Sequence, residues 1–545
     1  MTLTLLLSVA LARPVSPELP ANAPERRLTS TLTELWRSAA SPASHEAFVA
    51  THPRFAGDTV QIVVELAPGT DTAAFAAGLR LSAEASFEDR IQLRVPASRL
   101  GAIAAHPSVR HVREPYRAQA KEEVEGEGYD ATMPIDWHED EEVTGAGVHV
   151  GVLDVGFSGA DGLIGGELPS EVTFDLSRGA PESSKHGAAA AEVIADFAPD
   201  ATFTLVSFST DVEFGEGLQA LLDADVDVVN ASVGFDNIWA ADGTSAPTRY
   251  ADAMVEAGVI FVTAAGNERR RYRVGPLARV EDSTYIEIDG HYAIAMEAPN
   301  GRAHVSFRWS DPFGESATDL DLVVFDASTQ RECGRSENPQ DGDDDPLEEV
   351  DVSGCEENVY VAVYADLAVD PAGLTGYLYA HSGLDDAEQT GIESLSLPAD
   401  CLNCLAVGAY LLEDQSIAGY SSLGPTNDGR TKPDFVGPTD VSTATMADAP
   451  FDGTSAATPH LAGLAALWVQ ATGLDSEPGE FETWAAEQAK DLGDPGMDNT
   501  SGHGAIQGGE IPPRACGCAG VAAGAPVATM SVLAAMLGVH RRRRG

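Results

Sequence analysis

Four polar residues that lie far apart in the sequence could together cleave a peptide bond: Asp154, His186, Asn267 and Ser455. Peptide hydrolysis near neutral pH requires a hydroxyl nucleophile, a base that takes its proton, a carboxylate that holds the base and a donor for the oxyanion. Alone, each residue is equally well explained by a turn, a helix cap or an ordinary surface position. Together, and in this order, they favour nucleophilic catalysis by a serine.

The local sequence predicts that all four residues lie at one edge of a sheet. Asp154 and Asn267 each end an apolar run, whereas His186 and Ser455 each open a helical run. In an open α/β sheet, ligands bind outside the carboxyl ends of the strands, next to the helices that follow them. The sequence therefore predicts one site built from four separate segments.

From residue 147 onward, short apolar strands alternate with helices, which is typical of a parallel sheet covered on both faces. The expected strands are 148–153, 202–208, 227–230, 259–263 and 405–407, and the expected helices are 186–197, 214–223, 250–257 and 455–470. The alternation is interrupted between 273 and 397. Strands of period two at 285–288, 303–307, 321–325 and 359–364 predict an inserted antiparallel β-sandwich there.

The N-terminal part of the chain predicts a small α/β unit. Strands are expected at 59–65, 90–95 and 109–112, and helices at 71–81 and 96–105. An acidic stretch from 119 to 142 follows and has the composition of a solvated linker. Such a linker is a natural place for a processing cut.

The segments around the four polar residues resemble the signature blocks of the subtilase family of serine peptidases. They read Val152-Leu153-Asp154-Val155-Gly156, Ser184-Lys185-His186-Gly187, Ala264-Ala265-Gly266-Asn267 and Gly453-Thr454-Ser455-Ala456-Ala457-Thr458-Pro459-His460. The order Asp, His, Ser is also that family's order. The resemblance implies a subtilisin-like α/β fold, a catalytic triad of Asp154, His186 and Ser455, and an oxyanion donor in Asn267. The chain would then be an endopeptidase that works through an acyl-enzyme intermediate.

A further stretch, from Val229 to Gly234, resembles the family's substrate-binding strand. This implies that Ser232, Val233 and Gly234 contact the substrate. Two departures from the family pattern are visible: Ala188 stands where a Thr is usual, and the gap between Asn267 and Ser455 is much longer. The inserted sandwich explains the longer gap.

Of three other possible functions, two are disfavoured by the sequence and one remains as an alternative. An α/β-hydrolase esterase is disfavoured because Ser455 lies in Gly-Thr-Ser-Ala-Ala and not in Gly-x-Ser-x-Gly. A dinucleotide-binding domain is disfavoured because Gly145-Ala146-Gly147 precedes the first strand instead of following it. A catalytically inactive surface protein that uses the same fold for binding is the remaining alternative.

Both ends of the chain also carry resemblances. Residues 1–12 resemble a secretion signal, and the N-terminal unit resembles the inhibitory propeptides that precede subtilases. The C-terminal Cys516-Gly517-Cys518, the apolar run 519–539 and the arginines at 541–544 resemble sorting tails of the Myxo-CTERM type. These features imply a secreted or outer membrane-associated protein at the surface of a bacterium. The implied partners are protein or peptide substrates, the chain's own propeptide, and membrane or sorting machinery.

The expected domain boundaries follow from these observations. They are a signal peptide (1–12), an N-terminal segment (13–56), a propeptide-like inhibitor domain (57–118), an acidic linker (119–142), the first part of the catalytic domain (143–272), the inserted β-sandwich (273–397), the second part of the catalytic domain (398–510) and a sorting tail (511–545).

Composition limits the possible partners. The chain has 545 residues and a formal net charge of -52 at pH 7, which disfavours nucleic-acid binding because a phosphate backbone requires a basic face. Hydrophobic residues make up 43% of the chain, which is enough for globular domains.

Cysteines and acidic clusters suggest structural bonds, while the chemistry itself requires no cofactor. In an exported protein, Cys333 and Cys355, and Cys401 and Cys404, are expected to form local disulfides. A zinc site from these four is the weaker interpretation, because their spacing is irregular. Structural calcium is a further possibility, with Asp319 and Asp321 as ligands, or the acidic loop that holds Asp341, Asp343, Asp344 and Asp345.

Overall fold

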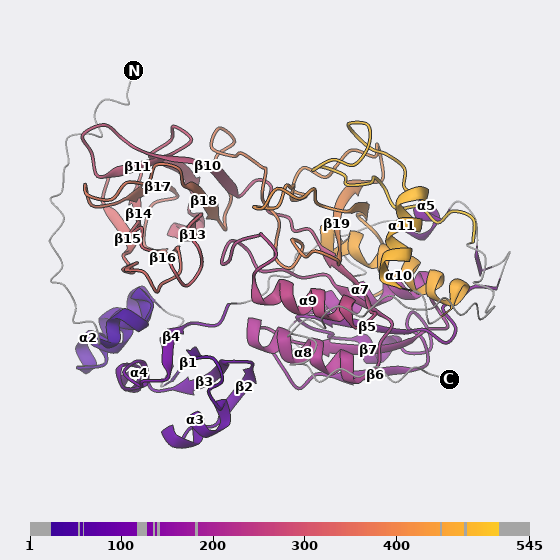
Figure 1. Cartoon of the computed structure of the whole chain (residues 1–545), viewed down its shortest axis with the longest axis horizontal. Helices are drawn as coiled ribbons and strands as arrows, with labels where there is room; N and C mark the ends of the chain where they lie inside the picture. The colour runs from indigo at the N-terminus through magenta and orange to yellow at the C-terminus, as the bar shows by residue number, and fades with distance from the viewer. Residues whose placement is uncertain are drawn as a thin grey trace, which may run out of the picture.

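The protein forms three separate β-sheets (Figure 1). The computed structural model describes residues 23–52, 55–57, 59–116, 128–133, 137–138, 142–179, 184–446, 450–473 and 477–511. The expected signal peptide, most of the acidic linker and nearly all of the sorting tail lie outside these residues. Residues 23–116 are termed the N-terminal unit, residues 272–380 the antiparallel region, and the remainder from residue 142 the α/β domain.

The α/β domain contains a seven-stranded sheet in which every neighbouring pair is parallel, in the order β20-β19-β9-β8-β5-β7-β6. The strands are β5 (His149–Asp154), β6 (Val172–Asp175), β7 (Thr202–Ser207), β8 (Val228–Ala231), β9 (Ile260–Ala264), β19 (Leu405–Leu411) and β20 (Phe435–Thr439). The subtilisin-like α/β fold expected from the sequence is confirmed. Because β5 is followed along the chain by strands on one side and then, from β8, by strands on the other, a switch point lies between β5 and β8.

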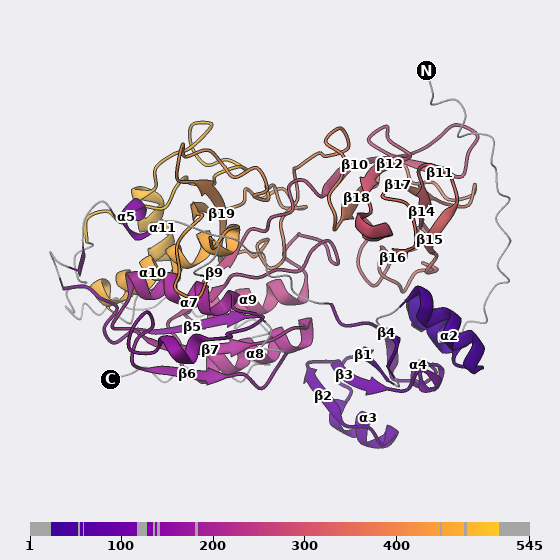
Figure 2. The ribbon, with the colours of Figure 1, turned by 180° about the vertical axis from the view of Figure 1, so that it is seen from behind.

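Helices cover both faces of this sheet, as Figure 2 shows from behind. The helices are α7 (His186–Phe197), α8 (Asp211–Asp223), α9 (Ala246–Glu256), α10 (Thr454–Thr472) and α11 (Pro478–Gln488). Apolar residues of α7, α10 and α11 share one core with the sheet, and those of α8 and α9 share another. The all-apolar strands of the sequence are therefore buried from both sides.

Two of these helices begin earlier than the apolar periodicity predicts, because side chains cap them. Thr210 Oγ1 accepts a hydrogen bond from Glu213 N, and Ser245 Oγ accepts one from Thr248 N. Such bonds satisfy amide groups that the first helical turn leaves without a partner. Helix α8 consequently starts at Asp211 and α9 at Ala246.

The antiparallel region separates β9 from β19 and holds nine strands around one apolar core. They are β10 (Tyr272–Arg279), β11 (Tyr285–Ile288), β12 (Ile294–Glu297), β13 (Arg302–Trp309), β14 (Asp321–Asp326), β15 (Glu332–Ser336), β16 (Leu347–Ser353), β17 (Asn358–Tyr364) and β18 (Thr375–Ala380). The four strands expected from period-two patterns are β11, β13, β14 and β17. The other five were not expected, since charged residues or glycines interrupt their alternation.

The N-terminal unit is built on an antiparallel sheet in the order β2-β3-β1-β4. Its elements are η2 (Pro24–Arg27), α1 (Ser30–Ser38), α2 (Pro42–Thr51), β1 (Val60–Leu66), α3 (Thr72–Leu79), β2 (Ala83–Phe87), β3 (Arg90–Val95), η4 (Ala97–Arg99), α4 (Leu100–Ala104) and β4 (Val109–Arg113). The sequence did not predict β2, α1 or α2. In both ribbon views this unit lies beside α8 and below the antiparallel region.

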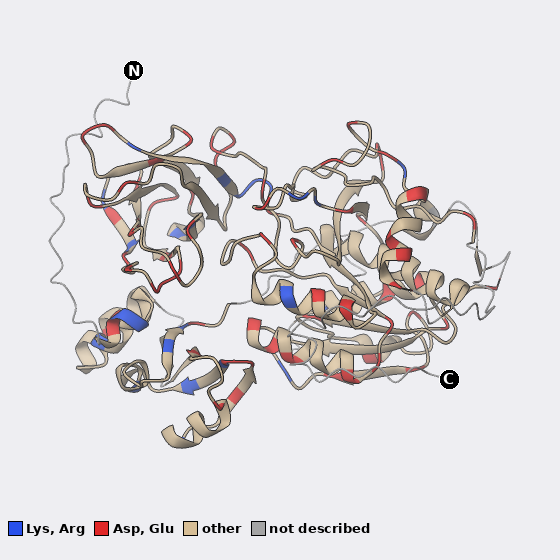
Figure 3. Ribbon diagram, viewed as in Figure 1, with Lys and Arg blue, Asp and Glu red and all other residues tan. Residues whose placement is uncertain are grey.

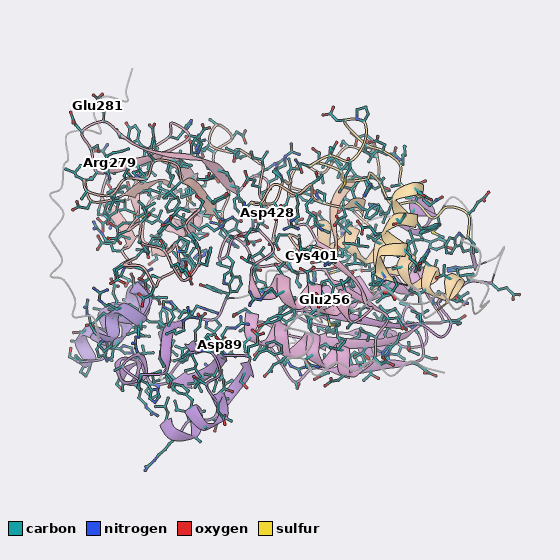
Figure 4. The ribbon with its side chains drawn as sticks, viewed as in Figure 1. Asp89, Glu256, Arg279, Glu281, Cys401 and Asp428 are labelled. Atoms are coloured by element: carbon teal, nitrogen blue, oxygen red, sulfur yellow. A yellow bond between two sulfur atoms is a disulfide. The ribbon has the colours of Figure 1, made fainter. Side chains whose placement is uncertain are left out.

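Buried polar contacts join the N-terminal unit to α8. Asp211, fully buried at the first position of α8, forms ion pairs with Arg113 at 2.8 Å and with Arg90 at 3.5 Å. Gln92 of β3 contacts Glu213 at 3.2 Å. Asp89, in the turn between β2 and β3, marks where this unit meets the α/β domain in Figure 4. These contacts remove charged groups from water, which is tolerated only when each finds a partner.

Acidic side chains are spread over all three parts of the molecule (Figure 3). Among the helices that the structure describes, none combines the length and the apolar character needed to cross a bilayer.

Candidate active site

Asp154 and His186 form a buried pair at the carboxyl edge of the sheet. Asp154 is the last residue of β5 and His186 the first residue of α7. Both Asp154 oxygens lie 2.9 Å from His186 Nδ1, and both side chains are completely buried. Because a carboxylate only accepts hydrogen bonds, Nδ1 carries the proton and Nε2 is left with its lone pair.

A close approach of backbone and side chain explains the glycine that follows His186. A Cβ atom at Gly187 would lie 2.6 Å from Asp154 Cβ. Gly187 N also donates to the carbonyl of Gly156 at 2.9 Å, which holds the start of α7 against the turn after β5. The His-Gly pair is therefore a requirement of packing at this site, whereas Ala188, which departs from the family pattern, is buried in the core.

Ser455 lies in the first turn of α10, which packs against the first turn of α7. Phe451 stacks edge-on against the His186 ring at 5.3 Å and shares an apolar cluster with Ala189 and Ala456. The Ser455 hydroxyl donates to the carbonyl of Ser232 at 2.8 Å. Among the described residues, His186 Nε2 is buried and has no hydrogen-bond partner. In this structure the Ser455 hydroxyl is therefore hydrogen-bonded to Ser232 and not to His186 Nε2.

Asn267 is oriented by its neighbour Thr454. Its Oδ1 accepts from Thr454 N at 2.9 Å and from Thr454 Oγ1 at 3.0 Å. The amide nitrogen Nδ2 is consequently turned away from Thr454, in contact range of Gly453, and remains a donor. Asn267 and Ser455 line the same pocket, so a side-chain amide and a hydroxyl-bearing residue face one space.

The expected substrate-binding residues are adjacent to this pocket. Val233 and Gly234 line it together with Gly266 and Ser455. Ser232 is buried beside them, and its hydroxyl donates to the carbonyl of Ser455 at 2.9 Å. Because β8 and β9 are parallel neighbours, the segments that follow them form the two walls of the pocket.

The sequence interpretation missed four residues at this site: Phe451, Asp236, Glu268 and Tyr379. Asp236 and Glu268 line the pocket, and both stand close in sequence to residues that were singled out. Their closeness in sequence to residues 232–234 and Asn267 could have indicated that they lie at the site. Tyr379 belongs to β18 in the antiparallel region, and its hydroxyl lies 3.0 Å from Glu268. Nothing in the sequence indicates that an inserted region would reach this pocket.

The cysteines of the described chain form two disulfides. Cys333 joins Cys355 with a Cα–Cα distance of 5.9 Å, and Cys401 joins Cys404 with 5.6 Å. The first bond lies in the antiparallel region, and the second in the α/β domain, where Figure 4 labels Cys401. With all four sulfur atoms bonded in pairs, none is available as a thiolate for zinc.

Of the two acidic clusters considered for calcium, the loop after β15 brings three carboxylates together. Within the described residues, the carboxylates that converge to within 4.8 Å of one another are those of Asp341, Asp343 and Asp344. Asp321 is buried in β14, and Asp319 accepts a hydrogen bond from Gln340 N at 3.3 Å. Calcium binding through Asp319 and Asp321 therefore stays a prediction.

Comparisons with known proteins agree with this geometry. The chain matches the model of the "Subtilase family" (Peptidase_S8) over residues 145–300 and 369–504, which is more than half of its length. The interval that the match leaves out, 301–368, holds β13 to β17. No curated protein matches the sequence.

Among solved structures, the chain is similar to the CspB protease of Clostridium perfringens. The two are 16% identical with a TM-score of 0.51, over 70% of this chain and 97% of that one. Fervidolysin from Fervidobacterium pennivorans, described as a keratinolytic enzyme related to subtilisin, is 15% identical with a TM-score of 0.44, over 83% of this chain and 61% of that one. The likeness to the CspB protease shows a shared fold, and the family match extends over both halves of the sheet with Asp154, His186, Asn267 and Ser455 inside it. The chain belongs to the subtilase family.

Proposed function

We propose that the protein is a serine endopeptidase that cleaves peptide bonds through Ser455, His186 and Asp154. The observation that carries the proposal is the buried Asp154–His186 pair, which leaves Nε2 as a base on α7, the helix that packs against α10 with Ser455 in its first turn. In family members with this arrangement the carboxylate holds the imidazole in the tautomer that accepts a proton.

The reaction proceeds in two halves. Ser455 Oγ attacks the scissile carbonyl carbon while its proton moves to His186 Nε2, and the oxyanion accepts a hydrogen bond from Asn267 Nδ2. The carbon–nitrogen bond then breaks, and the proton on Nε2 passes to the leaving amine. Water, deprotonated by the same nitrogen, releases the acyl group from Ser455 and restores the enzyme.

A fluorophosphonate probe tests this function directly, because it modifies only a serine that is activated as a nucleophile. We expect labelling of the processed protein at Ser455, and its loss in Ser455→Ala and in His186→Ala. The Ser455→Ala change should lower kcat for casein-derived peptides by about 10⁶. A folded protein that neither reacts with the probe nor hydrolyses peptides would instead be an inactive binding protein.

We further propose that the N-terminal unit is an inhibitory propeptide. It covers the start of α8 with the buried Arg113–Asp211 and Arg90–Asp211 ion pairs, and its last described residue, Tyr116, accepts a hydrogen bond from Asp211 N at 3.2 Å. Cleavage in the linker 119–142 would free it. In purified Ser455→Ala protein we expect the N-terminal unit to stay covalently attached; normal processing of that variant would mean that another peptidase makes the cut.

The secretion signal, the sorting tail and structural calcium belong to the same proposal. The acidic loop with Asp341, Asp343 and Asp344 supplies only part of the six to eight oxygen ligands that calcium takes, and Asp341 is ion-paired with Arg26. A bound ion stabilises the folded state by mass action. If the melting temperature is the same with calcium and with excess chelator, calcium does not stabilise this protein.

A further inference from the structure

The pocket beside Ser455 has a carboxylate on each wall. Asp236 follows the substrate-binding residues 232–234, and Glu268 follows Asn267 directly. Both residues line the pocket, and so does Ser455. A side chain that enters from a substrate bound at Ser455 therefore meets two acidic groups.

The two carboxylates differ in how their charge is compensated. Glu268 is fully buried and accepts from Arg271 Nη1 at 2.9 Å, so a cation already faces it. Asp236 accepts from two hydroxyls, Ser396 Oγ at 2.5 Å and Tyr379 Oη at 3.3 Å. In the part of the chain that the structure describes, no Lys, Arg or His forms an ion pair with Asp236. Within the described residues, Asp236 is therefore the carboxyl group of the pocket that no basic side chain of the protein pairs with.

Tyr379 connects the two walls. Its hydroxyl lies within hydrogen-bond distance of both Asp236 and Glu268, at 3.3 and 3.0 Å. Burial, together with the charge of Asp236, holds the pKa of Tyr379 well above its usual range, so the hydroxyl keeps its proton. Its ring packs against Tyr272 at 5.2 Å. The antiparallel region thus places one hydroxyl between the two carboxylates, and its single proton can be donated to either of them.

The floor of the pocket is narrow. A Cβ atom at Gly234 would lie 2.5 Å from Ser396 Cβ, and one at Gly266 would lie 2.2 Å from Ser396 Oγ. Ser396 therefore occupies the space between the two walls. The free volume is only about 10 Å³, so any substrate side chain has to displace Ser396. A slender side chain that ends in a cation displaces less than an aromatic ring does, and its methylene groups can lie against Val233 and Ala264, which also line the pocket.

We propose that this pocket selects a Lys or Arg side chain at the residue whose carbonyl Ser455 attacks, with Asp236 as the ion-pair partner and Tyr379 as a positioning residue. The inference rests on the proposed peptidase function. A carboxylate and a guanidinium or ammonium group form charge-assisted hydrogen bonds, and these are stronger in a pocket that excludes water than at the surface.

The chain carries suitable residues of its own next to the acidic linker. Between residues 117 and 142, Arg117 and Lys121 are the only Lys or Arg residues in the sequence. If the enzyme releases its own N-terminal unit, the cut should follow one of these two residues. N-terminal sequencing of the processed protein that begins at residue 118 or 122 would agree with the proposal, and a cut after an acidic or apolar residue would contradict it.

A substrate panel provides the main test. Peptides that differ only at the residue before the cut, with Arg, Lys, norleucine, Phe, Ala or Glu, are compared with the processed enzyme. Norleucine matches the shape of the Lys stem without its charge. We expect kcat/KM to be about 10- to 100-fold higher for Arg and Lys than for norleucine. Equal or higher values for norleucine, Phe or Ala would overturn the inference.

Variants then assign the preference to named residues. Asp236→Asn should lower the ratio of kcat/KM for Arg over norleucine about 10-fold or more. Tyr379→Phe should raise KM for the Arg peptide several-fold, with little change for norleucine, whereas a merely structural defect would affect both peptides equally. Asp386→Asn, which removes one charge at an exposed site of the same chain, is the matched control and should leave the ratio unchanged.

Failure of the specificity inference can be distinguished from failure of the proposed function. An enzyme that reacts with the fluorophosphonate probe but prefers uncharged peptides is a serine peptidase with another specificity. A protein that does not react with the probe and cleaves no peptide of the panel is not a serine peptidase, and the proposed function is then wrong. The substrate panel uses only the wild-type enzyme, so it tests the specificity even if the Asp236→Asn variant fails to fold.

Discussion

At the scale of single residues, a hydrogen bond to one polar atom of a side chain determines where its other polar atom points. Asp154 binds His186 Nδ1 and thereby presents Nε2. Thr454 holds Asn267 Oδ1 through two donors and thereby presents Nδ2. In the proposed mechanism Asn267 Nδ2 is therefore in place before substrate arrives, and such preorganisation is what makes oxyanion stabilisation effective.

Replacing Asn267 by Leu should separate catalysis from binding. The leucine has a similar size but cannot donate to an oxyanion, so we expect kcat to fall about 10²- to 10³-fold while KM changes little. Steady-state kinetics on a good peptide substrate measure both values. Labelling of Ser455 by fluorophosphonate should persist, more slowly; an unchanged kcat would mean that Asn267 is not the donor.

At the scale of secondary structure, helix α8 connects the α/β domain to the N-terminal unit. Its first residue, Asp211, is completely buried between Arg113 and Arg90. A carboxylate in the first turn of a helix is also favoured by the helix dipole. The start of α8 is thus the point at which docking of the N-terminal unit is most sensitive to a single charge.

Asp211→Asn should loosen that docking. The change leaves two buried guanidinium groups with less compensation, and loss of one partner of such a pair weakens an interface by about 2–5 kcal/mol. In a Ser455→Ala background, where the chain stays intact, hydrogen–deuterium exchange in β2 and β3 should accelerate. Asp223→Asn, at the exposed opposite end of α8, makes the same charge change and should have no such effect.

The disulfide in the antiparallel region should stabilise it independently of the active site. Cys333 and Cys355 are separated by 22 positions in the sequence, and closure of a loop of that length stabilises a fold by about 3 kcal/mol in the chain-entropy model. The double change of both residues to Ser should lower the melting temperature measured by calorimetry. An equal melting temperature for the two proteins would show that the bond does not contribute.

At the scale of the whole molecule, the N-terminal unit contacts both other parts. It binds α8, and it also binds the antiparallel region, where Ser30 donates to Asn338 Oδ1 through its amide at 2.8 Å and Thr51 accepts from Ser353 Oγ at 2.8 Å. Acidic groups meet at this second contact. Burial, followed by the charge of Glu65, raises the pKa of Asp345 to about 6.

This contact should weaken as the pH rises. A carboxyl group whose pKa is raised by docking favours the docked state when protonated, so the contribution of Asp345 is complete near pH 4 and declines until the pH exceeds about 6. Two other groups act in the opposite sense. Burial lowers the pKa of His111, so its protonation in acid disfavours docking. Although burial alone would raise the pKa of Glu65, Arg113 lowers it to about 2, so its contribution is lost as the pH falls from about 4.5 to about 2.

Size-exclusion chromatography can measure this dependence. Ser455→Ala protein cut in the linker by an added peptidase should retain its N-terminal unit better at pH 4.5 than at pH 7, by about three- to tenfold in dissociation constant, because a pKa shift of one unit corresponds to a tenfold change and Asp345 is only half-buried. Asp345→Asn should remove most of the difference. Retention that is independent of pH in the parent protein would contradict the assignment.

Much of this protein can be predicted from its sequence alone. Apolar runs buried from both sides predicted the parallel sheet, because only a strand covered on both faces can be apolar throughout. The glycines and small residues around Asp154, His186, Asn267 and Ser455 form local motifs, and these indicated the fold family and the candidate site. Strands β2, β6, β10, β12, β15, β16, β18 and β20 were not predicted, since polar residues, glycines or prolines interrupt the apolar or alternating pattern of most of them.

Only the tertiary structure decided which residues from different parts of the chain meet. The placement of Tyr379 between Asp236 and Glu268, and of Asp211 between Arg90 and Arg113, joins segments that are more than 90 positions apart. No periodicity or local motif encodes such contacts, because they arise from the packing of whole sheets and helices against one another. The sequence therefore determined what the site is made of, whereas the packing determined the charge and shape of the pocket beside it.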